Sequence, residues 1–281
     1  MAFDSNDSWT ILSNIEQSIK AKIDATGVPL KDWNISINYG IKTGFNDAFI
    51  ITGSRKDELI AADPKSAEII RPILRGRDIK RYGYYFADLW LINVHNGIKD
   101  KNIPRIQIDD YPAIKEHLDL YYEKLAKRSD RGETPYNLRN CAYMDDFSKP
   151  KIVWGNLCLS SQFSFANEDL FVNAPSPMIV PGNKYILAVL NSKLADWYIR
   201  QLGVTRNGGY FEYKPMFVEQ LPIPQISKDE EGAFVSIVDR ILEKKKDGED
   251  TQNLEGEIDK LVYQLYGLTA EEVEYMKLQL N

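Results

Sequence analysis

The periodicity of apolar residues changes near residue 225, and this change constrains the fold more than any other feature. Beyond that position, apolar residues recur at spacings of three and four along two segments that the turn KKKDGED separates, which predicts an antiparallel helical hairpin. Gly267 then ends the second helix, and Thr269 with Glu272 forms a capping-box pattern that begins a short third helix. Residues 226–281 are therefore expected to form a helical hairpin and a terminal helix.

Residues 30–225 follow a different pattern, in which short β-rich runs alternate with Gly, Pro and Asn. NISINYG and DAFIITG predict the two strands of a hairpin, joined by the loop GIKTGFN. Residues 111–130 and 185–203 have the spacing of single helices. We expect an α+β fold, with a mixed strand-rich domain at 30–225 and flanking helices.

The N-terminal segment and the aromatic residues complete the predicted fold. An amphipathic stripe over residues 8–25 predicts a lead-in helix, so that residues 1–29 form the first of three segments. Aromatic side chains in a strand-rich segment usually pack inward. We therefore expect a core position for Tyr82, Tyr84, Tyr85, Phe86 and Trp90.

Composition excludes several classes of protein. The longest apolar runs, such as YILAVL, are far shorter than the roughly 18 residues of a membrane span. The beginning of the chain is acidic and polar, unlike a secretory signal, so we expect a cytoplasmic protein without a membrane partner. Two cysteines and two histidines without a CxxC motif make a disulfide framework or a zinc site improbable.

The charge is distributed unevenly. The formal net charge is -6, but residues 40–151 hold 20 Lys and Arg against 17 Asp and Glu, whereas residues 226–281 hold 7 against 14. Within the middle region, cations cluster at residues 71–81 and again at 124–139. Such clusters suit a polyanion; the alternative is a solvated charged face with interleaved acids.

Motifs of catalysis are not found in the sequence. None of GxGxxG, GxxxxGK[ST] or a Pro-Pro-aromatic loop occurs. The acidic pairs Asp109–Asp110 and Asp145–Asp146 are the nearest approach to a magnesium site, and we interpret both as turn or helix caps. His95 and His117 lack the partners of a catalytic triad. We therefore predict no catalytic residue, no bound metal and no cofactor in this chain.

Several longer motifs do resemble one family in their order. They are GIKTGFNDAFII, IIRPILRGRDIKRYG, YPAIKEHL, RGETPYNLRNCAY, KPKIVWGN, LNSKLADWYIRQ and FEYKPMFVEQLPIP. This succession resembles the C-terminal specificity domain of the TaqI-like and Eco57I-like adenine-N6 DNA methyltransferases, the type IIG enzymes that often join restriction and modification in one chain. The resemblance extends over nearly the whole chain from about residue 30.

The resemblance implies a target-recognition domain that reads a short sequence in double-stranded DNA. A separate methyltransferase domain or subunit, which binds S-adenosylmethionine, would flip and methylate the adenine. Because this chain lacks that catalytic half, we expect either an excised piece of a longer protein or a stand-alone subunit.

Candidate DNA-binding residues follow from the chemistry of base and phosphate recognition, in which Arg favours guanine, Asn favours adenine and Lys holds phosphates. For the candidates in the GIKTGFN loop, the alternative role is to form a plain hairpin turn. In the RGRDIKR segment the alternative is salt bridging to Asp78. The candidates are Lys42, Thr43, Asn46, Arg75, Arg77, Lys80, Arg81, Arg128, Arg131, Arg139 and Asn140, with Arg206 and Asn207 as further ones.

A second hypothesis assigns the activity to the acidic C-terminal helices. Their apolar seams would then meet a helix of another protein or of a second copy, as a docking or dimerisation module.

Overall fold

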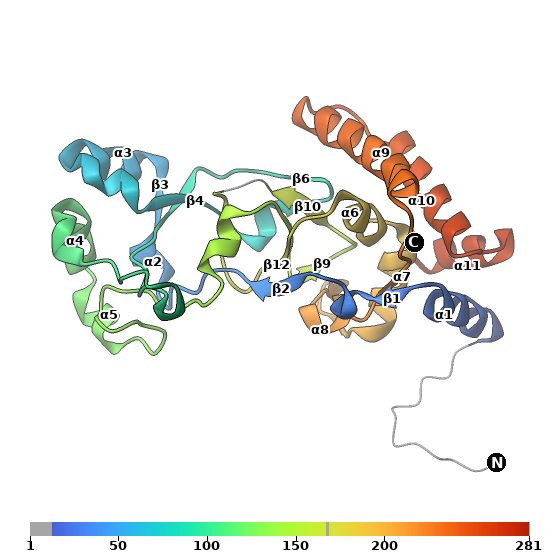
Figure 1. Ribbon diagram of the computed structural model, residues 1–281, viewed down its shortest axis with the longest axis horizontal. Helices are drawn as coiled ribbons and strands as arrows, with labels where there is room; N and C mark the ends of the chain where they lie inside the picture. The colour runs from blue at the N-terminus through green and yellow to red at the C-terminus, as the bar shows by residue number, and fades with distance from the viewer. Residues whose placement is uncertain (1–12, 167–168, 281) are drawn as a thin grey trace, which may run out of the picture.

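A four-stranded antiparallel sheet lies at the centre of the molecule and separates two hydrophobic cores (Figure 1). The computed structural model describes residues 13–166 and 169–280. The strand order of this sheet is β10 (Phe163–Ala166), β8 (Lys151–Trp154), β12 (Pro177–Val180) and β2 (Ser36–Tyr39).

Alternation along the central strands explains why the sheet has a core on each face. Neighbouring side chains of a strand point to opposite faces. In β8, Ile152 and Trp154 belong to one core and Val153 to the other, and in β12 Ile179 and Met178 divide in the same way. The central strands are therefore buried on both sides.

The first of the two hydrophobic cores includes residues of the central sheet and of a second four-stranded sheet. The strand order is β11 (Phe171–Val172), β4 (Ile70–Leu74), β7 (Leu89–Ile92) and β3 (Ile50–Thr52), of which β11 and β4 run parallel. The helices of this end are α2 (Asn46–Phe49), α3 (Gly53–Ala62), α4 (Pro112–Asp119) and α5 (Tyr122–Lys127). Figure 1 shows α3, α4 and α5 gathered at one end of the molecule.

The second core contains the remaining long helices. They are α1 (Asn14–Thr26), α6 (Lys184–Leu190), α7 (Lys193–Leu202), α9 (Lys228–Lys246), α10 (Gln252–Leu265) and α11 (Ala270–Leu280), with the short α8 (Pro215–Val218) beside them. Trp154, Tyr185, Phe234 and Ile258 all belong to this core. The hydrophobic core therefore continues across residue 225, and the domain boundaries at 29 and 225 stay a prediction.

Three small sheets complete the architecture. They are β13 (Thr205–Arg206), β14 (Tyr210–Glu212) and β9 (Leu157–Cys158); β5 (Ile79–Lys80) and β6 (Gly83–Tyr84); and β1 (Val28–Pro29) and β15 (Pro222–Ile223). No helix among the described residues is long and apolar enough to cross a membrane.

The α+β class and the C-terminal helices are confirmed. In α11, the Thr269 side chain accepts from Glu272 N–H, and the Glu272 carboxylate accepts from Thr269 N–H. Gly267 takes the left-handed conformation, with φ of 63°, as predicted for the end of α10. The lead-in helix is confirmed from Asn14 onward, and residues 8–12 lie outside the described residues.

Other local predictions were wrong. β2 and β3 form no hairpin, because β2 pairs with β12 and β3 with β7, and α2 occupies part of the expected second strand. The single helices expected at 111–130 and 185–203 are each broken in two. At the second break, the Ser192 side chain caps α7 by accepting from Ala195 N–H.

The aromatic residues of 82–90 divide between core and surface. Tyr82 is fully buried, as predicted, and Trp90 is half-buried. Tyr84, Tyr85 and Phe86 are exposed, so the core interpretation was wrong for them. They lie on a two-residue strand and the connection after it.

Candidate nucleic-acid interface

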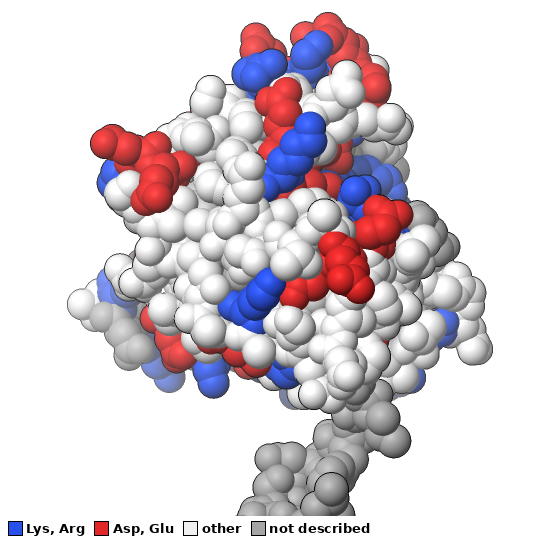
Figure 2. All heavy atoms as spheres, turned by 90° about the vertical axis from the view of Figure 1, so that its right-hand side faces the viewer, with Lys and Arg blue, Asp and Glu red and all other residues white. Residues whose placement is uncertain are grey.

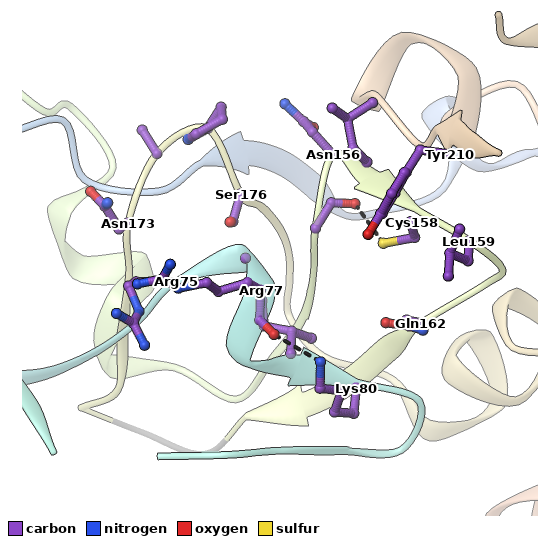
Figure 3. A pocket seen from close by; sticks show the side chains of 16 residues that line it. Arg75, Arg77, Lys80, Asn156, Cys158, Leu159, Gln162, Asn173, Ser176 and Tyr210 are labelled. Atoms are coloured by element: carbon purple, nitrogen blue, oxygen red, sulfur yellow. Dashed lines mark hydrogen bonds between the residues drawn. The ribbon is translucent and has the colours of Figure 1, made fainter. Parts of the chain in front are cut away.

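Pocket A is a hollow of about 540 Å³ bordered by the 3-10 turn Gly76–Asp78, strand β9, strand β14 and the loop before β12. Its lining comprises Arg75, Gly76, Arg77, Ile79, Lys80, Gly155, Asn156, Leu157, Cys158, Leu159, Gln162, Asn173, Ala174, Pro175, Ser176 and Tyr210. Figure 3 shows Arg75 and Arg77 on one side of the pocket, and Asn156, Leu159 and Tyr210 on the other.

Pocket B is a neighbouring hollow of about 570 Å³. Its lining comprises Tyr39, Gly40, Ile41, Lys42, Arg139, Asn140, Cys141, Ala142, Tyr143, Ala174 and Pro175. Ala174 and Pro175 border both pockets. Segments that are more than 100 residues apart in the sequence, around Lys42 and Asn173, therefore meet on this face.

The cations of pocket A are held by a tight turn. Gly76 is required there, because a Cβ atom would lie 2.6 Å from the Oγ atom of the buried Ser176. The Arg75 guanidinium donates to both carboxylate oxygens of Asp78, at 2.7 and 2.9 Å, and this hydrogen bonding raises the pKa of Arg75. The alternative of a salt bridge to Asp78 thus holds for Arg75.

Arg77 and Lys80 are the free cations of pocket A. Both side chains are exposed, and neither forms an ion pair within the described part of the chain. The Lys80 ammonium donates to the Arg77 carbonyl at 2.8 Å, which keeps the two residues together (Figure 3). Two positive charges without a carboxylate partner suit phosphate oxygens.

Pocket B contains two cations that share one acid. Asp130 lies 2.9 Å from the Lys42 ammonium and 3.1 Å from the Arg139 guanidinium. The hydrogen bond from Lys42 is the main cause that lowers the pKa of Asp130, so the carboxylate stays ionised. Since one carboxylate lies between two cations, this cluster keeps a net positive charge. Asn140 also lines pocket B, and its side-chain oxygen accepts a hydrogen bond from the Asn96 amide.

Thr43 and Asn46 line neither pocket, and their side chains hydrogen-bond within the turn. The buried Thr43 hydroxyl donates to Asn46 Oδ1 at 2.6 Å and accepts from Phe45 N–H at 3.2 Å. Gly44 is left-handed, with φ of 69°, and a Cβ atom on Gly40 would lie 2.2 Å from the Val172 carbonyl. The alternative of a structural turn therefore holds for Thr43 and Asn46, and Lys42 projects from it.

Arg81 connects the strand-rich part to the C-terminal helices. Its guanidinium forms an ion pair with Glu255 of α10 and lies over the Tyr82 ring at 5.5 Å from the centroid. The side chain lines neither pocket. Its charge is neutralised within the protein.

Arg128 and Arg131 have different environments although they are three residues apart. Arg128 is 8% exposed and donates to the carbonyls of Thr43, Pro135 and Asn137. Burial lowers the pKa of Arg128 to about 10. Arg131 is exposed, lines neither pocket and forms no ion pair with any residue that the structure describes.

Several polar or aromatic residues of pocket A were not predicted as candidates, among them Asn156, Gln162, Asn173 and Tyr210. Asn156 ends the motif KPKIVWGN, and Tyr210 follows Gly208 and Gly209, both of which are left-handed. The position of Tyr210 directly after two glycines was the sequence signal that could have identified it as a candidate. Nearby Arg206 donates to Glu212 at 2.6 Å, and Asn207 is exposed in the turn.

Other residues that the sequence drew attention to are engaged elsewhere. Asp145 pairs with Lys101, and Asp146 pairs with Lys149 at 2.8 Å. The buried His117 hydrogen-bonds the Ala48 carbonyl. Both cysteines are buried free thiols.

Comparison with solved structures identifies the fold. The type IIL restriction-modification enzyme MmeI, solved in complex with DNA, superimposes with a TM-score of 0.68 and 15% identity over 89% of this chain. The type IIG restriction endonuclease BpuSI superimposes with a TM-score of 0.53 and 13% identity over 90%. This chain covers 36% and 33% of those two chains. The fold is therefore that of one region of restriction-modification enzymes.

Comparison of sequences identifies the family. The TaqI-like C-terminal specificity domain matches residues 71–223, which include all of pocket A. The type II methyltransferase M.MjaIV of Methanocaldococcus jannaschii is 25% identical over 280 residues, which cover 91% of this chain and 88% of that protein. This chain belongs to the TaqI-like C-terminal specificity domain family, as the order of its motifs predicts.

Proposed function

We propose that this chain is the sequence-reading, double-stranded-DNA-binding module of a type IIG restriction-modification adenine-N6 methyltransferase. The observation that carries the proposal is the meeting of Arg77 and Lys80 with Lys42 and Arg139 on the two sides of Ala174–Pro175. Family membership adds to it, because a specificity domain is the part of such enzymes that selects the target.

The residues divide into two roles. Lys42, Lys80 and Arg139 hold phosphates, because they are exposed, Lys42 and Arg139 on loops and Lys80 at the end of strand β5. Arg77 and Asn140 read base edges, the guanidinium favouring guanine and the amide favouring adenine. Arg131, on the same loop as Arg139, adds a phosphate contact at the rim. Thr43, Asn46, Arg75, Arg81 and Arg128 support the fold around these residues.

Catalysis belongs to another part of the enzyme in this proposal. A methyltransferase domain or subunit supplies S-adenosylmethionine and transfers the methyl group to adenine, with or without an associated endonuclease. The match of this chain to a type II methyltransferase supports the pairing with that activity.

The alternative of a docking module through the C-terminal helices has weaker support. The seam residues Phe234, Val238, Ile241, Ile258 and Val262 are buried in the second core of this same chain. Figure 2 shows the end of the molecule that carries these helices, where acidic and basic side chains lie among uncharged ones. The apolar seams are therefore used within the chain and are not free for another helix.

A titration of duplex DNA of random sequence at two salt concentrations tests the binding role. With about four phosphate contacts, we expect the affinity to fall about 100-fold between roughly 50 and 200 mM salt. Fluorescence anisotropy of a labelled duplex measures it. An affinity that is independent of salt, or the absence of binding at the lower salt, would contradict the proposal.

A further inference from the structure

Pocket A has a wall that phosphate binding does not use. Opposite Arg75 and Arg77 lie two exposed apolar side chains, Tyr210 at 43% and Leu159 at 52% (Figure 3). Leu157, which is 51% exposed, lines the same pocket. The three residues come from β14, β9 and the residue after β9, which are paired through Phe211 and Cys158. Backbone pairing thus fixes Tyr210 relative to Leu157 and Leu159 within this apolar wall.

The pocket also contains an unused hydrogen-bonding group. Asn156 Oδ1 is buried and has no hydrogen-bond partner among the described residues. A buried polar atom without a partner costs free energy unless a ligand or water satisfies it. The amide of Gln162 lines the same pocket and makes no hydrogen bond within the described ranges.

These features together define one class of ligand. A cationic wall binds a phosphate, an exposed aromatic ring stacks on a base, and amide groups bond to the base edge. A volume of about 540 Å³ lies within the usual range for small-molecule sites and is large enough for a single nucleotide. A base that remains stacked in a duplex presents only its edge, and therefore leaves the Tyr210 ring without a partner.

We propose that pocket A holds a single unstacked nucleotide of the bound DNA, with its base on Tyr210 and its edge at Asn156 and Gln162. This inference rests on the proposed function and deepens it. It makes local distortion of the DNA a part of recognition, because extruding a base costs least where pairing is already absent.

The test compares two duplexes of the same sequence, of which one carries a single unpaired nucleotide. We expect the chain to bind the bulged duplex about 10-fold more tightly than the paired one at equal salt. Tyr210→Ala is expected to abolish this preference, because its affinity for the bulged duplex falls about 10-fold more than its affinity for the paired duplex. Tyr210→Phe keeps the ring and is expected to keep the preference, since the Tyr210 hydroxyl makes no hydrogen bond with the described residues.

Tyr122→Ala is the matched control. Tyr122 is 46% exposed, lies on α5 and lines neither pocket A nor pocket B, so this variant should keep the preference. Salt-sensitive binding of the paired duplex without any preference for the bulge would overturn the inference and leave the proposed function in place. An equal loss on both duplexes in Tyr210→Ala would also overturn it, and failure of the unsubstituted chain to bind either duplex would overturn the proposed function as well.

Discussion

Replacement of Arg77 and Lys80 by alanine in one chain is expected to lower the affinity for duplex DNA about 10- to 100-fold. The reason is that these two exposed cations have no carboxylate partner among the described residues, so the ammonium of Lys80 is available to phosphate and the guanidinium of Arg77 to a base edge. Removal of the Lys80 phosphate contact should also reduce the slope of log affinity against log salt by about one. Anisotropy titrations over a series of salt concentrations measure both quantities.

A charge-matched variant separates the local effect from the change in net charge. Lys246 and Lys260 are exposed on α9 and α10, outside both pockets. Lys246→Ala with Lys260→Ala removes the same two charges, and salt screens charges beyond about 10 Å. We expect this variant to bind within about twofold of the unsubstituted chain. Equal losses in the two double variants would contradict the assignment of pocket A to DNA.

Arg128→Ala is expected to lower the free energy of unfolding by about 3 kcal/mol. The guanidinium donates to the carbonyls of Thr43, Pro135 and Asn137 and lies over the Phe49 ring at 4.5 Å from the centroid. Truncation removes the side-chain donor from the Thr43 and Pro135 carbonyl oxygens, whereas the Asn137 carbonyl still accepts from Gly132 N–H. It also leaves the space of the guanidinium beside Phe49 empty, and both effects destabilise the folded state. Urea unfolding followed by tryptophan fluorescence measures the change.

Arg131→Ala is the control for this prediction. Because Arg131 is exposed and unpaired within the described residues, its truncation should change the free energy of unfolding by less than about 0.5 kcal/mol. It should instead weaken DNA binding about threefold and reduce the salt slope by about one. If Arg131→Ala lowered the free energy of unfolding more than Arg128→Ala does, the prediction that the buried arginine is the stabilising one would be wrong.

This contrast shows which parts of the site were predictable from the sequence. RSDRGETPYNLRN contains three arginines of similar local context. Arg128 is buried, Arg131 is exposed, and Arg139 shares Asp130 with Lys42. The roles depend on carbonyl groups and a carboxylate that reach each arginine only after folding, so residue type alone assigned all three to DNA.

The fold likewise has parts that local sequence signals specify and parts that they do not. The C-terminal helices were predictable because helix periodicity, Gly267 and the Thr269–Glu272 capping box are local signals. The pairing of β2 with β12 joins residues about 140 positions apart, and no local signal specifies such a partner. The β4 strand contains Pro72, and a proline within an apolar run usually argues against a strand.

Pocket A illustrates the same limit. Arg75, Arg77 and Lys80 were visible as a basic cluster, whereas Asn156, Gln162 and Tyr210 come from three other segments. They reach the cluster only through the pairing of β9 with β14 and through the packing of Gly76 on Ser176. Sequence reasoning thus identified the basic wall of pocket A and missed the apolar and amide wall.

The measurement that tests the reading of DNA sequence most directly is selection from a pool of random duplexes, followed by sequencing of the bound fraction. We predict that the pool bound at near-physiological salt becomes enriched in one short motif that contains adenine. Arg77→Ala should relax the preference at one position of that motif, because a single base-edge contact is lost. A bound pool with the same sequence composition as the input would contradict the proposal, and the chain would then be a surface that holds phosphates without reading bases.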